Sequence, residues 1–307
     1  MRASAALCQW LGRDLPNPPM KTPPARFLNR LSPAFAAVTL LAFPVAALGQ
    51  ITFVDLSPSG ATDSEATATA GTQQAGFATI GGLLTAGIWS GTAASFVNLN
   101  PPGAFQSEAL ATSGTQQAGF AVIGGAVNAG LWSSTAASFV NLNPTSATQS
   151  TAYSTTGTQQ AGFATIFGVD SAGIWSSTAG SFVNMNPAGA SRSFALATTG
   201  TQQAGFAAIN GVVGAALWSG SAQSFVNLNP TGATQSVATA IAGIQQAGYA
   251  YFDSGELVPY AGIWSGTAAT FVNLNPFGAT QSQTTATTGT QQAGYAEYNN
   301  IPKETLI

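Results

Sequence analysis

Short runs that alternate apolar with small or polar residues recur along most of the chain, separated by turn signals. The segment 107–144 shows one complete set of four runs, at 107–112, 116–123, 129–133 and 138–143. None of these runs keeps a helical apolar period, and Gly interrupts every window long enough for a helix. Turn residues such as Gly-Gly, Ser-Gly and Asn-Pro lie between the runs. The pattern predicts an all-β protein with four short strands in each such segment.

This segment is one unit of an internal repeat with a period close to 43 residues. The tetrapeptide Gln-Gln-Ala-Gly begins at residues 73, 116, 159, 202, 245 and 291. A single three-residue insertion falls between Tyr251 and Tyr260. A period of about 40–45 residues is typical of four-stranded propeller blades. Residues 50–307 amount to 258 residues, or six periods of 43.

The two ends of the repeated region complement each other. Residues 51–56 match the fourth run alone, whereas the last unit has the first two runs and lacks the fourth. An N-terminal strand that completed the last unit would cover open sheet edges, which invite aggregation. We therefore predict a single domain, a six-bladed β-propeller closed by this strand, with the first run of each blade innermost. The predicted blades span 64–101, 107–144, 150–187, 193–230, 236–276, and 282–307 together with 51–58. An open β-solenoid is the alternative.

The N-terminal region differs in composition from the repeats. It holds five of the seven basic residues of the chain: Arg2, Arg13, Lys21, Arg26 and Arg30. An apolar run at 34–49 follows and ends in small residues, as a signal peptidase site does. The run is short for a membrane span. Residues 1–49 are predicted to be an export signal, with Met20 as an alternative start and a membrane-anchoring N-terminus as the alternative role. Residues 50–307 are predicted to be secreted or held at the cell surface, without a stable membrane span.

Composition excludes several classes of function. The 307 residues include 7 Lys and Arg, 10 Asp and Glu, one Cys and no His. One Cys cannot form an intrachain disulfide, and a His/Cys zinc site needs more ligands. A Ser-His-Asp or Cys-His nucleophile lacks its base, and the chain is too acidic for a typical nucleic-acid binder. We predict no catalytic residue, no metal site, no cofactor and no nucleic-acid partner.

The repeat resembles the repeats of the HAF family of probable extracellular bacterial proteins over residues 51–307. The shared positions include Gly119-Phe120, Gly248-Tyr249, Ile88-Trp89, Leu131-Trp132, Leu99 and Leu142. The His of the family motif is replaced by Thr85, Asn128, Ser171, Gly214 and Tyr260. The Phe two positions later is replaced by Gly87, Gly130, Gly173, Ala216 and Gly262. The resemblance implies an exported β-repeat protein and gives little information about its activity.

The repeated Trp residues are the first candidates for ligand binding. Aromatic faces arranged around a ring can stack on sugars, with one pocket at each blade junction. The alternative is packing between blades, since each Trp lies within a strand and aromatic side chains dominate core energetics. The candidates are Trp89, Trp132, Trp175, Trp218 and Trp264.

The Gln-Gln pairs are the second candidates, because side-chain amides donate and accept hydrogen bonds as sugar hydroxyls require. The candidates are the first Gln of each pair: Gln73, Gln116, Gln159, Gln202 and Gln245. The alternative is a structural ladder in which one Gln of each pair bonds to the backbone at the turn between the first and second runs. The Asn residues before each Pro, such as Asn98 and Asn100, are interpreted as turn initiators.

Carboxylates that depart from the repeat are the third candidates. Glu65 and Glu108 occupy equivalent places in the first run of adjacent blades, and Asp63 lies close to Glu65. In a central channel they would suit Ca²⁺ or an acid/base pair of the glycosidase kind. The other blades carry Thr151, Phe194, Val237 and Gln283 at this place.

Three functions follow from these features. The first is a secreted or surface-bound, non-catalytic binding or adhesion module with a glycan or protein ligand. The second is an extracellular structural scaffold, and the third is a carboxylate-based glycan hydrolase or lyase. Burial distinguishes them: exposed Trp edges favour the first, buried Trp rings the second, and a pocket holding Glu65 and Glu108 the third.

Overall fold

The computed structural model of the protein describes residues 53–252, 258–298 and 301–306. The chain divides into a unit of residues 1–54 and a unit of residues 55–307, and the sheets described below belong to the second unit. The predicted export signal and the alternative start at Met20 lie outside the described residues. No helix in the described part of the chain is long and apolar enough to cross a membrane.

The described residues form six antiparallel sheets, which confirms the prediction of a repetitive all-β protein. Sheet 1 contains β1 (Ala61–Ala70), β2 (Gln73–Ile80), β3 (Leu83–Trp89) and β4 (Val97–Asn98). Sheet 2 contains β5 (Ala104–Thr112), β6 (Gln117–Ile123), β7 (Ala126–Trp132) and β8 (Val140–Asn141). Sheet 3 contains β9 (Ala147–Thr155), β10 (Gln160–Ile166), β11 (Val169–Trp175) and β12 (Val183–Asn184).

The later sheets repeat this order, and the last one is shorter. Sheet 4 contains β13 (Ala190–Thr198), β14 (Gln203–Ile209), β15 (Val212–Trp218) and β16 (Val226–Asn227). Sheet 5 contains β17 (Gln235–Ala242), β18 (Gln245–Tyr251), β19 (Pro259–Trp264) and β20 (Val272–Asn273). Sheet 6 contains β21 (Ala279–Thr287), β22 (Gln292–Tyr298) and β23 (Ile301–Leu306).

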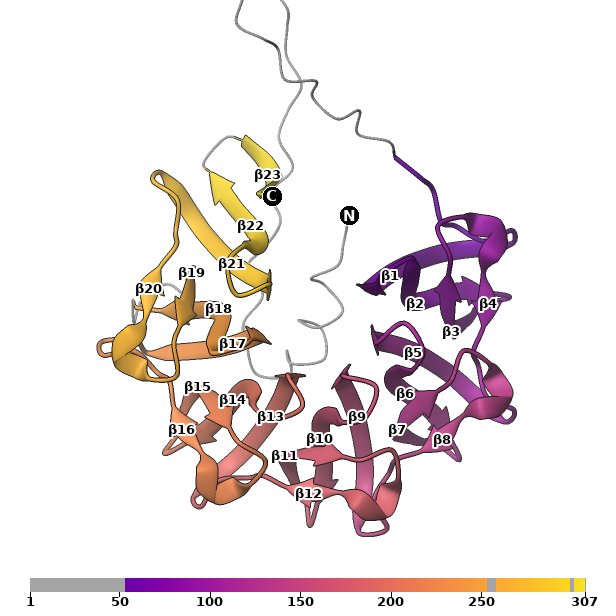
Figure 1. Ribbon diagram of the computed structural model, residues 1–307, viewed down its shortest axis with the longest axis horizontal. Helices are drawn as coiled ribbons and strands as arrows, with labels where there is room; N and C mark the ends of the chain where they lie inside the picture. The colour runs from indigo at the N-terminus through magenta and orange to yellow at the C-terminus, as the bar shows by residue number, and fades with distance from the viewer. Residues whose placement is uncertain (1–52, 253–257, 299–300, 307) are drawn as a thin grey trace, which may run out of the picture. The chain divides into compact units, whose positions relative to one another are not determined.

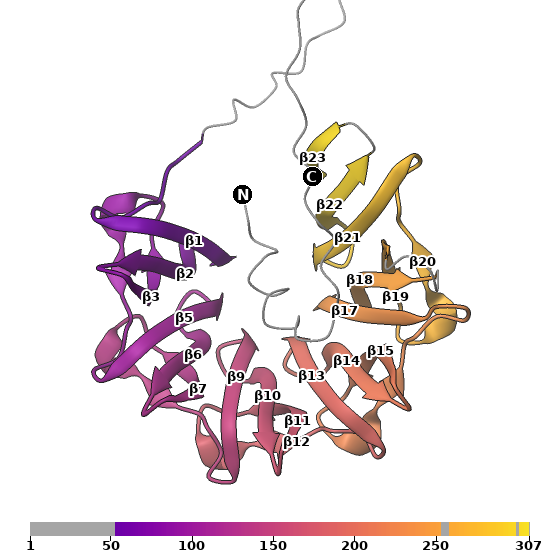
Figure 2. The same cartoon turned by 180° about the vertical axis from the view of Figure 1, so that it is seen from behind.

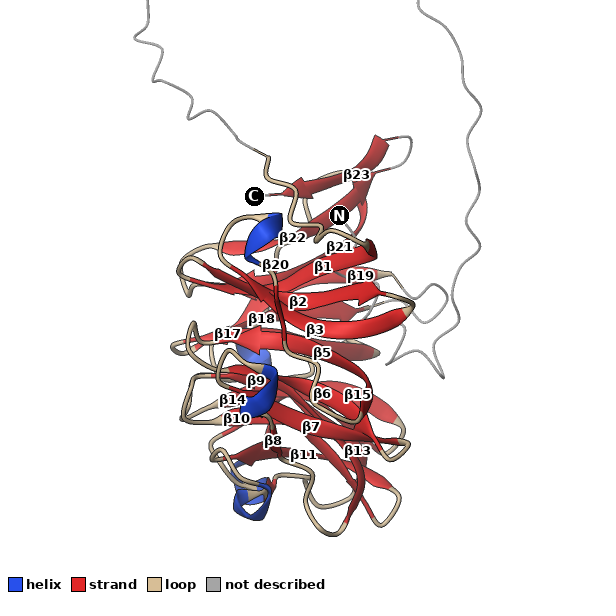
Figure 3. Ribbon diagram, turned by 90° about the vertical axis from the view of Figure 1, so that its right-hand side faces the viewer, coloured by secondary structure: helices blue, strands red, loops and turns tan. Residues whose placement is uncertain are grey.

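One turn of 3-10 helix precedes the fourth strand in each of sheets 1–5 (Figure 3). The five turns are η1 (Ala93–Ser95), η2 (Ala136–Ser138), η3 (Ala179–Ser181), η4 (Ala222–Ser224) and η5 (Ala268–Thr270). In sheet 2 the Ser138 hydroxyl accepts a hydrogen bond from Ser133 N at 2.7 Å and donates one to the Thr135 carbonyl at 2.6 Å. Of the predicted fourth run 138–143, Ser138 therefore belongs to the turn, and only Val140 and Asn141 form a strand.

Within the unit of residues 55–307, consecutive sheets lie side by side along an arc, with the first strand of each sheet on the inner side (Figures 1 and 2). The sheet order places the first strand at one edge and the short fourth strand at the other. No closed propeller is formed by the described residues. Of the segment 51–58, which was predicted to complete the last blade, the described residues 53–58 form no strand, and sheet 6 has three strands.

A hydrophobic core fills the junction between consecutive sheets. Between sheets 1 and 2, small side chains of one sheet meet a Trp of the next: Ala75, Ala86, Ile88 and Leu99 pack against Ala109, Ala121 and Trp132. The junctions that follow, up to that of sheets 4 and 5, repeat this composition. Ala on one face leaves room for the indole of the other, so the repeat of Ala and Trp determines the spacing of the sheets.

The Gly of each Gln-Gln-Ala-Gly is required where the first two strands approach. A Cβ at Gly119 would lie 2.0 Å from the backbone oxygen of Glu108, and a Cβ at Gly162 would lie 1.9 Å from that of Thr151. Both distances are far below any real contact, so only Gly allows this approach.

The Gly on the third strand makes room for an aromatic pair. A Cβ at Gly130 would lie 2.4 Å from the ring of Phe139, which packs on Trp132 with ring centroids 5.1 Å apart. Sheet 4 has Ala216 at this place, and its Trp–Phe pair lies further apart, at 5.9 Å. The extra methyl group accounts for the wider spacing.

A hydrogen-bonded relay joins each sheet to the next through a Ser of the first strand. Ala129 N donates to Ser150 Oγ at 3.0 Å, and Ser150 Oγ donates to Asn143 Oδ1 at 2.6 Å. Asn143 N in turn donates to Asn141 Oδ1 at 2.8 Å. The same bonds recur at the corresponding Ser and Asn residues of the other junctions. The interpretation of the Asn residues as turn initiators is confirmed.

Candidate functional site

Four of the five Trp residues proposed for ligand stacking lie in the cores between consecutive sheets, and Trp89 of sheet 1 packs on Phe96 of its own unit. Trp89 is 1% exposed and the other four, Trp132, Trp175, Trp218 and Trp264, are 0% exposed. Their Nε1 atoms are buried without a hydrogen-bond partner in the described part of the chain, so the rings act as apolar bodies. Rings buried to this extent leave little surface for a sugar in the folded protein. The packing alternative accounts for their burial.

The first Gln of a pair bonds to the next sheet in three of the junctions. Gln73 Oε1 accepts from Thr112 Oγ1 at 2.6 Å and from Gln117 Nε2 at 2.8 Å. Gln159 and Gln245 accept from the next sheet in the same way. These amides therefore serve the junctions between sheets 1 and 2, 3 and 4, and 5 and 6.

The remaining candidates of this set differ. Gln116 Oε1 and Gln160 Nε2, which would form the same bond between sheets 2 and 3, are buried without a partner in the described residues. At the position of Thr112, the first strand of sheet 5 has Ile241, so Gln202 lacks the hydroxyl donor that Gln73 has.

The second Gln of each pair bonds to the backbone at a turn. Gln74 and Gln246 donate to the carbonyls of Thr72 and Ile244 at the expected turn, and all five second Gln residues also accept a bond at a different turn. Gln117 Oε1 accepts from Ser134 N at 2.8 Å, in the turn that follows the third strand. Gln74, Gln160, Gln203 and Gln246 make the equivalent bond. The register explains the difference, since Gln117 lies opposite Trp132, the last residue of that third strand. The amide ladder is structural.

The remaining candidates for ligand binding are side chains that depart from the repeat. Glu65 and Glu108 lie on β1 and β5, the first strands of adjacent sheets, and Thr67 Oγ1 of β1 donates to the Ala109 carbonyl of β5 at 2.7 Å. Glu108 is buried and Glu65 is half-buried. The Oε1 atom of each carboxyl group is buried without a hydrogen-bond partner in the described part of the chain.

Burial changes the acidity of these groups. It raises the pKa of Glu108 from 4.5 to about 7, and the charge of Glu65 adds to the shift. Burial also raises the pKa of Glu65, with a further contribution from Asp63. Tyr153, which departs from the Leu of the neighbouring sheets, has its pKa raised by burial and by the charges of Asp170 and Glu108. Perturbed acids of this kind gather at functional sites more often than elsewhere.

Tyr153 was not among the sequence candidates, and it extends the carboxyl pair toward an aromatic region. Its ring stacks on Phe163 at a centroid distance of 6.0 Å, and Phe163 contacts Phe194 at 4.6 Å. The signal for Tyr153 was its departure from the repeat, where sheets 2 and 4 carry Leu110 and Leu196.

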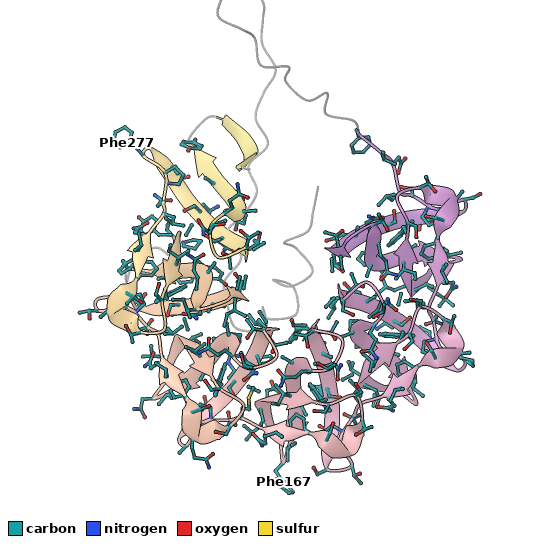
Figure 4. The ribbon with its side chains drawn as sticks, viewed as in Figure 1. Phe167 and Phe277 are labelled. Carbon is teal, nitrogen blue, oxygen red and sulfur yellow. The ribbon has the colours of Figure 1, made fainter. Side chains whose placement is uncertain are left out.

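Exposed aromatic side chains are scattered and form no common surface with this site. Phe167 and Phe277 point outward from different sheets (Figure 4). Phe167 is 93% exposed and has a positive φ of 51°, in a turn where the other repeats have Gly81, Gly124 and Asn210. Single exposed apolar residues are normal on a soluble surface and call for no ligand.

No group of three metal-ligating side chains is found among the residues that the structure describes. Comparison with known proteins adds no family: the chain matches no family model, and no curated protein matches it. The resemblance to HAF repeats therefore stays a prediction.

Proposed function

We propose that this protein is an exported, non-catalytic scaffold that acts at the cell surface or outside the cell through contacts with other proteins. One observation carries the proposal: the aromatic and amide side chains that repeat most faithfully are used inside the molecule. The Trp rings fill the junctions and the Gln amides bond to neighbouring turns and sheets. Repetition here serves folding, and a multivalent lectin with one Trp pocket for each repeat has no support in this geometry.

We further propose that the six sheets close into a six-bladed propeller. The outer faces of the first and last sheets carry residues that are buried at the other junctions. Ala66 is exposed, whereas its equivalent Ala109 is fully buried; Ala293 is exposed, whereas its equivalent Ala118 is fully buried. Two such faces complement each other, and their contact would remove apolar surface from water.

The polar groups of these two faces complement each other as well. A cavity of about 410 Å³ on the last sheet is lined by residues 286–288 and 291–293, which include Gln291. Gln291 is the equivalent of Gln73, which accepts hydrogen bonds from Thr112 and Gln117 of the next sheet. Sheet 1 offers Thr69 and Gln74 at the same places as these two donors. Closure would give the last junction the same hydrogen bonds as the first.

The N-terminal segment already has the local structure of a fourth strand's end. Ser57 N donates to Asp55 Oδ1 at 2.8 Å, as Asn100 N donates to Asn98 Oδ1 at 2.7 Å. Phe53 is 82% exposed, whereas its equivalents pack on a Trp. Pairing of this segment with the free edge of β23 would complete sheet 6.

The functional proposal is tested with the full chain expressed in a host that carries out export. We expect the protein outside the cytoplasm with its N-terminal segment removed, as mass spectrometry would show. We also expect no binding on a glycan array and no hydrolysis of array glycans by the folded protein. Glycan binding that is lost in Trp132→Ala but kept in Trp132→Phe, with circular dichroism unchanged, would establish a lectin instead. Retention of the intact chain in the cytoplasm would contradict export.

A further inference from the structure

Two carboxyl groups lie together where the repeat places uncharged residues in its other units. Glu65 on β1 and Glu108 on β5 hold equivalent positions on the first strands of neighbouring sheets. The four remaining sheets carry Thr151, Phe194, Val237 and Gln283 at this position. Thr67 Oγ1 of β1 donates to the Ala109 carbonyl of β5 at 2.7 Å, so the two strands are in contact beside the two carboxyl-bearing residues.

This pair lacks the partners that buried carboxyl groups normally have. Glu108 is 7% exposed, and its Oε1 atom, like that of Glu65, has no hydrogen-bond partner in the described residues. The basic side chain that the structure describes, Arg192, belongs to sheet 4 rather than to sheets 1 or 2. An unpaired buried charge is costly, and a cation bound between the two groups would offset that cost.

Aromatic rings flank the pair. Phe77 lies directly opposite Glu65 in the β1–β2 ladder, and Phe120 lies opposite Glu108 in the β5–β6 ladder. Residues opposite each other in an antiparallel ladder project to the same face. Tyr153 lies on β9 of the next sheet, and the charge of Glu108 contributes to its raised pKa.

This combination distinguishes between classes of cation. Ca²⁺ takes six to eight oxygen ligands, and no described group of three ligating side chains is present. An organic ammonium group needs fewer acceptors and is attracted to the faces of aromatic rings. We propose that Glu65 and Glu108 bind an alkylammonium group, such as a Lys side chain of a partner protein. The inference rests on the local geometry and does not depend on the proposed scaffold function.

Binding at this site competes with a proton. Burial and Glu65 raise the pKa of Glu108 to about 7, so near neutral pH Glu108 is about half protonated. The titratable groups that face the pair are Asp63 on β1 and Tyr153 on β9, and Asp170 on β11 acts on Tyr153. An ammonium ion favours the ionised carboxyl, and its affinity therefore rises as the pH rises through 7.

The experiment follows the carboxyl signals by NMR on the full chain labelled with ¹³C glutamate, which has five Glu residues to assign. The probe is n-butylammonium chloride, and NaCl at the same concentration is the salt control. We expect saturating butylammonium to lower the apparent pKa of Glu108 by about one unit. This shift means that butylammonium binds about tenfold more tightly when Glu108 is ionised than when it is protonated. An equal shift with NaCl, or a shift with CaCl₂ and none with butylammonium, would overturn the assignment.

Variants separate the site from general charge. Glu65→Gln is expected to weaken butylammonium binding at least tenfold at pH 8, and Glu108→Gln is expected to do the same. Asp63→Asn removes a neighbouring exposed carboxylate and is expected to change the affinity less than twofold. If Glu108→Gln does not fold, Glu65→Gln decides, because Glu65 is only half-buried. Equal loss in Asp63→Asn and Glu65→Gln would reduce the effect to surface charge and refute the site.

Discussion

At the residue scale, the smallest side chains decide how closely the strands approach. The Gly of each Gln-Gln-Ala-Gly faces a backbone carbonyl at a distance that excludes a Cβ atom. The third-strand Gly faces a Phe ring, and sheet 4 shows the result of adding one methyl group there. Both sets of Gly residues are thus required by packing against a specific neighbour.

Gly162→Ala tests this close approach. The new Cβ would lie 1.9 Å from the Thr151 carbonyl oxygen, so the two strands must separate. We expect a loss of about 2 kcal/mol or more in the free energy of unfolding, because overpacking that displaces backbone is at the upper end of such effects. Urea titration followed by Trp fluorescence measures it.

The control is Gly180→Ala, at an exposed place where other repeats have Ala94, Ala137 and Ala269. A Cβ there would meet nothing within 4 Å, so we expect a change of about 0.5 kcal/mol at most. Equal effects of the two substitutions would contradict the packing role of Gly162.

At the element scale, each junction combines an Ala face, a Trp, a Ser relay and in places a Gln bond. The junction between sheets 1 and 2 adds the carboxyl pair, which makes it sensitive to pH. The unfolded chain loses the Glu108 proton near pH 4.5, whereas the folded protein keeps it until about pH 7. The folded state therefore binds more protons between these values, and its stability falls as the pH rises through this window.

We expect the protein to lose on the order of 3 kcal/mol of stability between pH 4.5 and pH 7 from this group, since 2.5 pKa units correspond to about that amount. Urea unfolding at pH 5 and pH 8 measures the difference. Glu108→Gln should remove most of it and should be the more stable variant at pH 8. A wild-type protein as stable at pH 8 as at pH 5 would show that Glu108 ionises without cost.

At the scale of the whole molecule, the proposed closure places Asp55 opposite Leu306. In sheet 1, Asn98 pairs with Gly87, which in turn lies opposite Gly76. Asp55 is the equivalent of Asn98, and Leu306 lies opposite Gly294, the equivalent of Gly76. Directly paired residues in an antiparallel ladder have Cα atoms about 4.5–5.5 Å apart, which suits a disulfide.

The double variant Asp55→Cys with Leu306→Cys, made with Cys8→Ser, should therefore form an intramolecular disulfide under mild oxidation. Non-reducing electrophoresis and mass spectrometry detect it. The control pairs Asp55→Cys with Lys303→Cys, three residues along the same strand, and should remain reduced. Disulfide-linked dimers would show that the free edge of β23 pairs with a second copy of the chain. The absence of any disulfide would contradict the proposed closure.

The sequence by itself determined the features that depend on local chemistry and on repetition. The alternation of apolar and polar residues and the turn signals predicted the strands, and the period near 43 predicted six equivalent sheets. Strand ends were less accurate: the first strand of sheet 2 begins at Ala104 rather than at Ser107, and the fourth is only Val140–Asn141, preceded by a 3-10 turn. The Ser138 hydroxyl stabilises that turn by accepting one hydrogen bond and donating another. A pattern of apolar residues gives no signal for such bonds.

Only the tertiary structure decided which side chains are available to a ligand. A Trp in a strand has the same sequence signal whether it faces solvent or a neighbouring sheet. Contact with the preceding sheet buries four of them: Trp132, Trp175, Trp218 and Trp264. The same contact gave Gln73, Gln159 and Gln245 hydrogen bonds to the next sheet. It also placed Glu108 on the sheet between those of Glu65 and Tyr153. Burial and charge coupling arise from neighbours distant in sequence, which is why the carboxyl pair acquired its chemistry only in the folded protein.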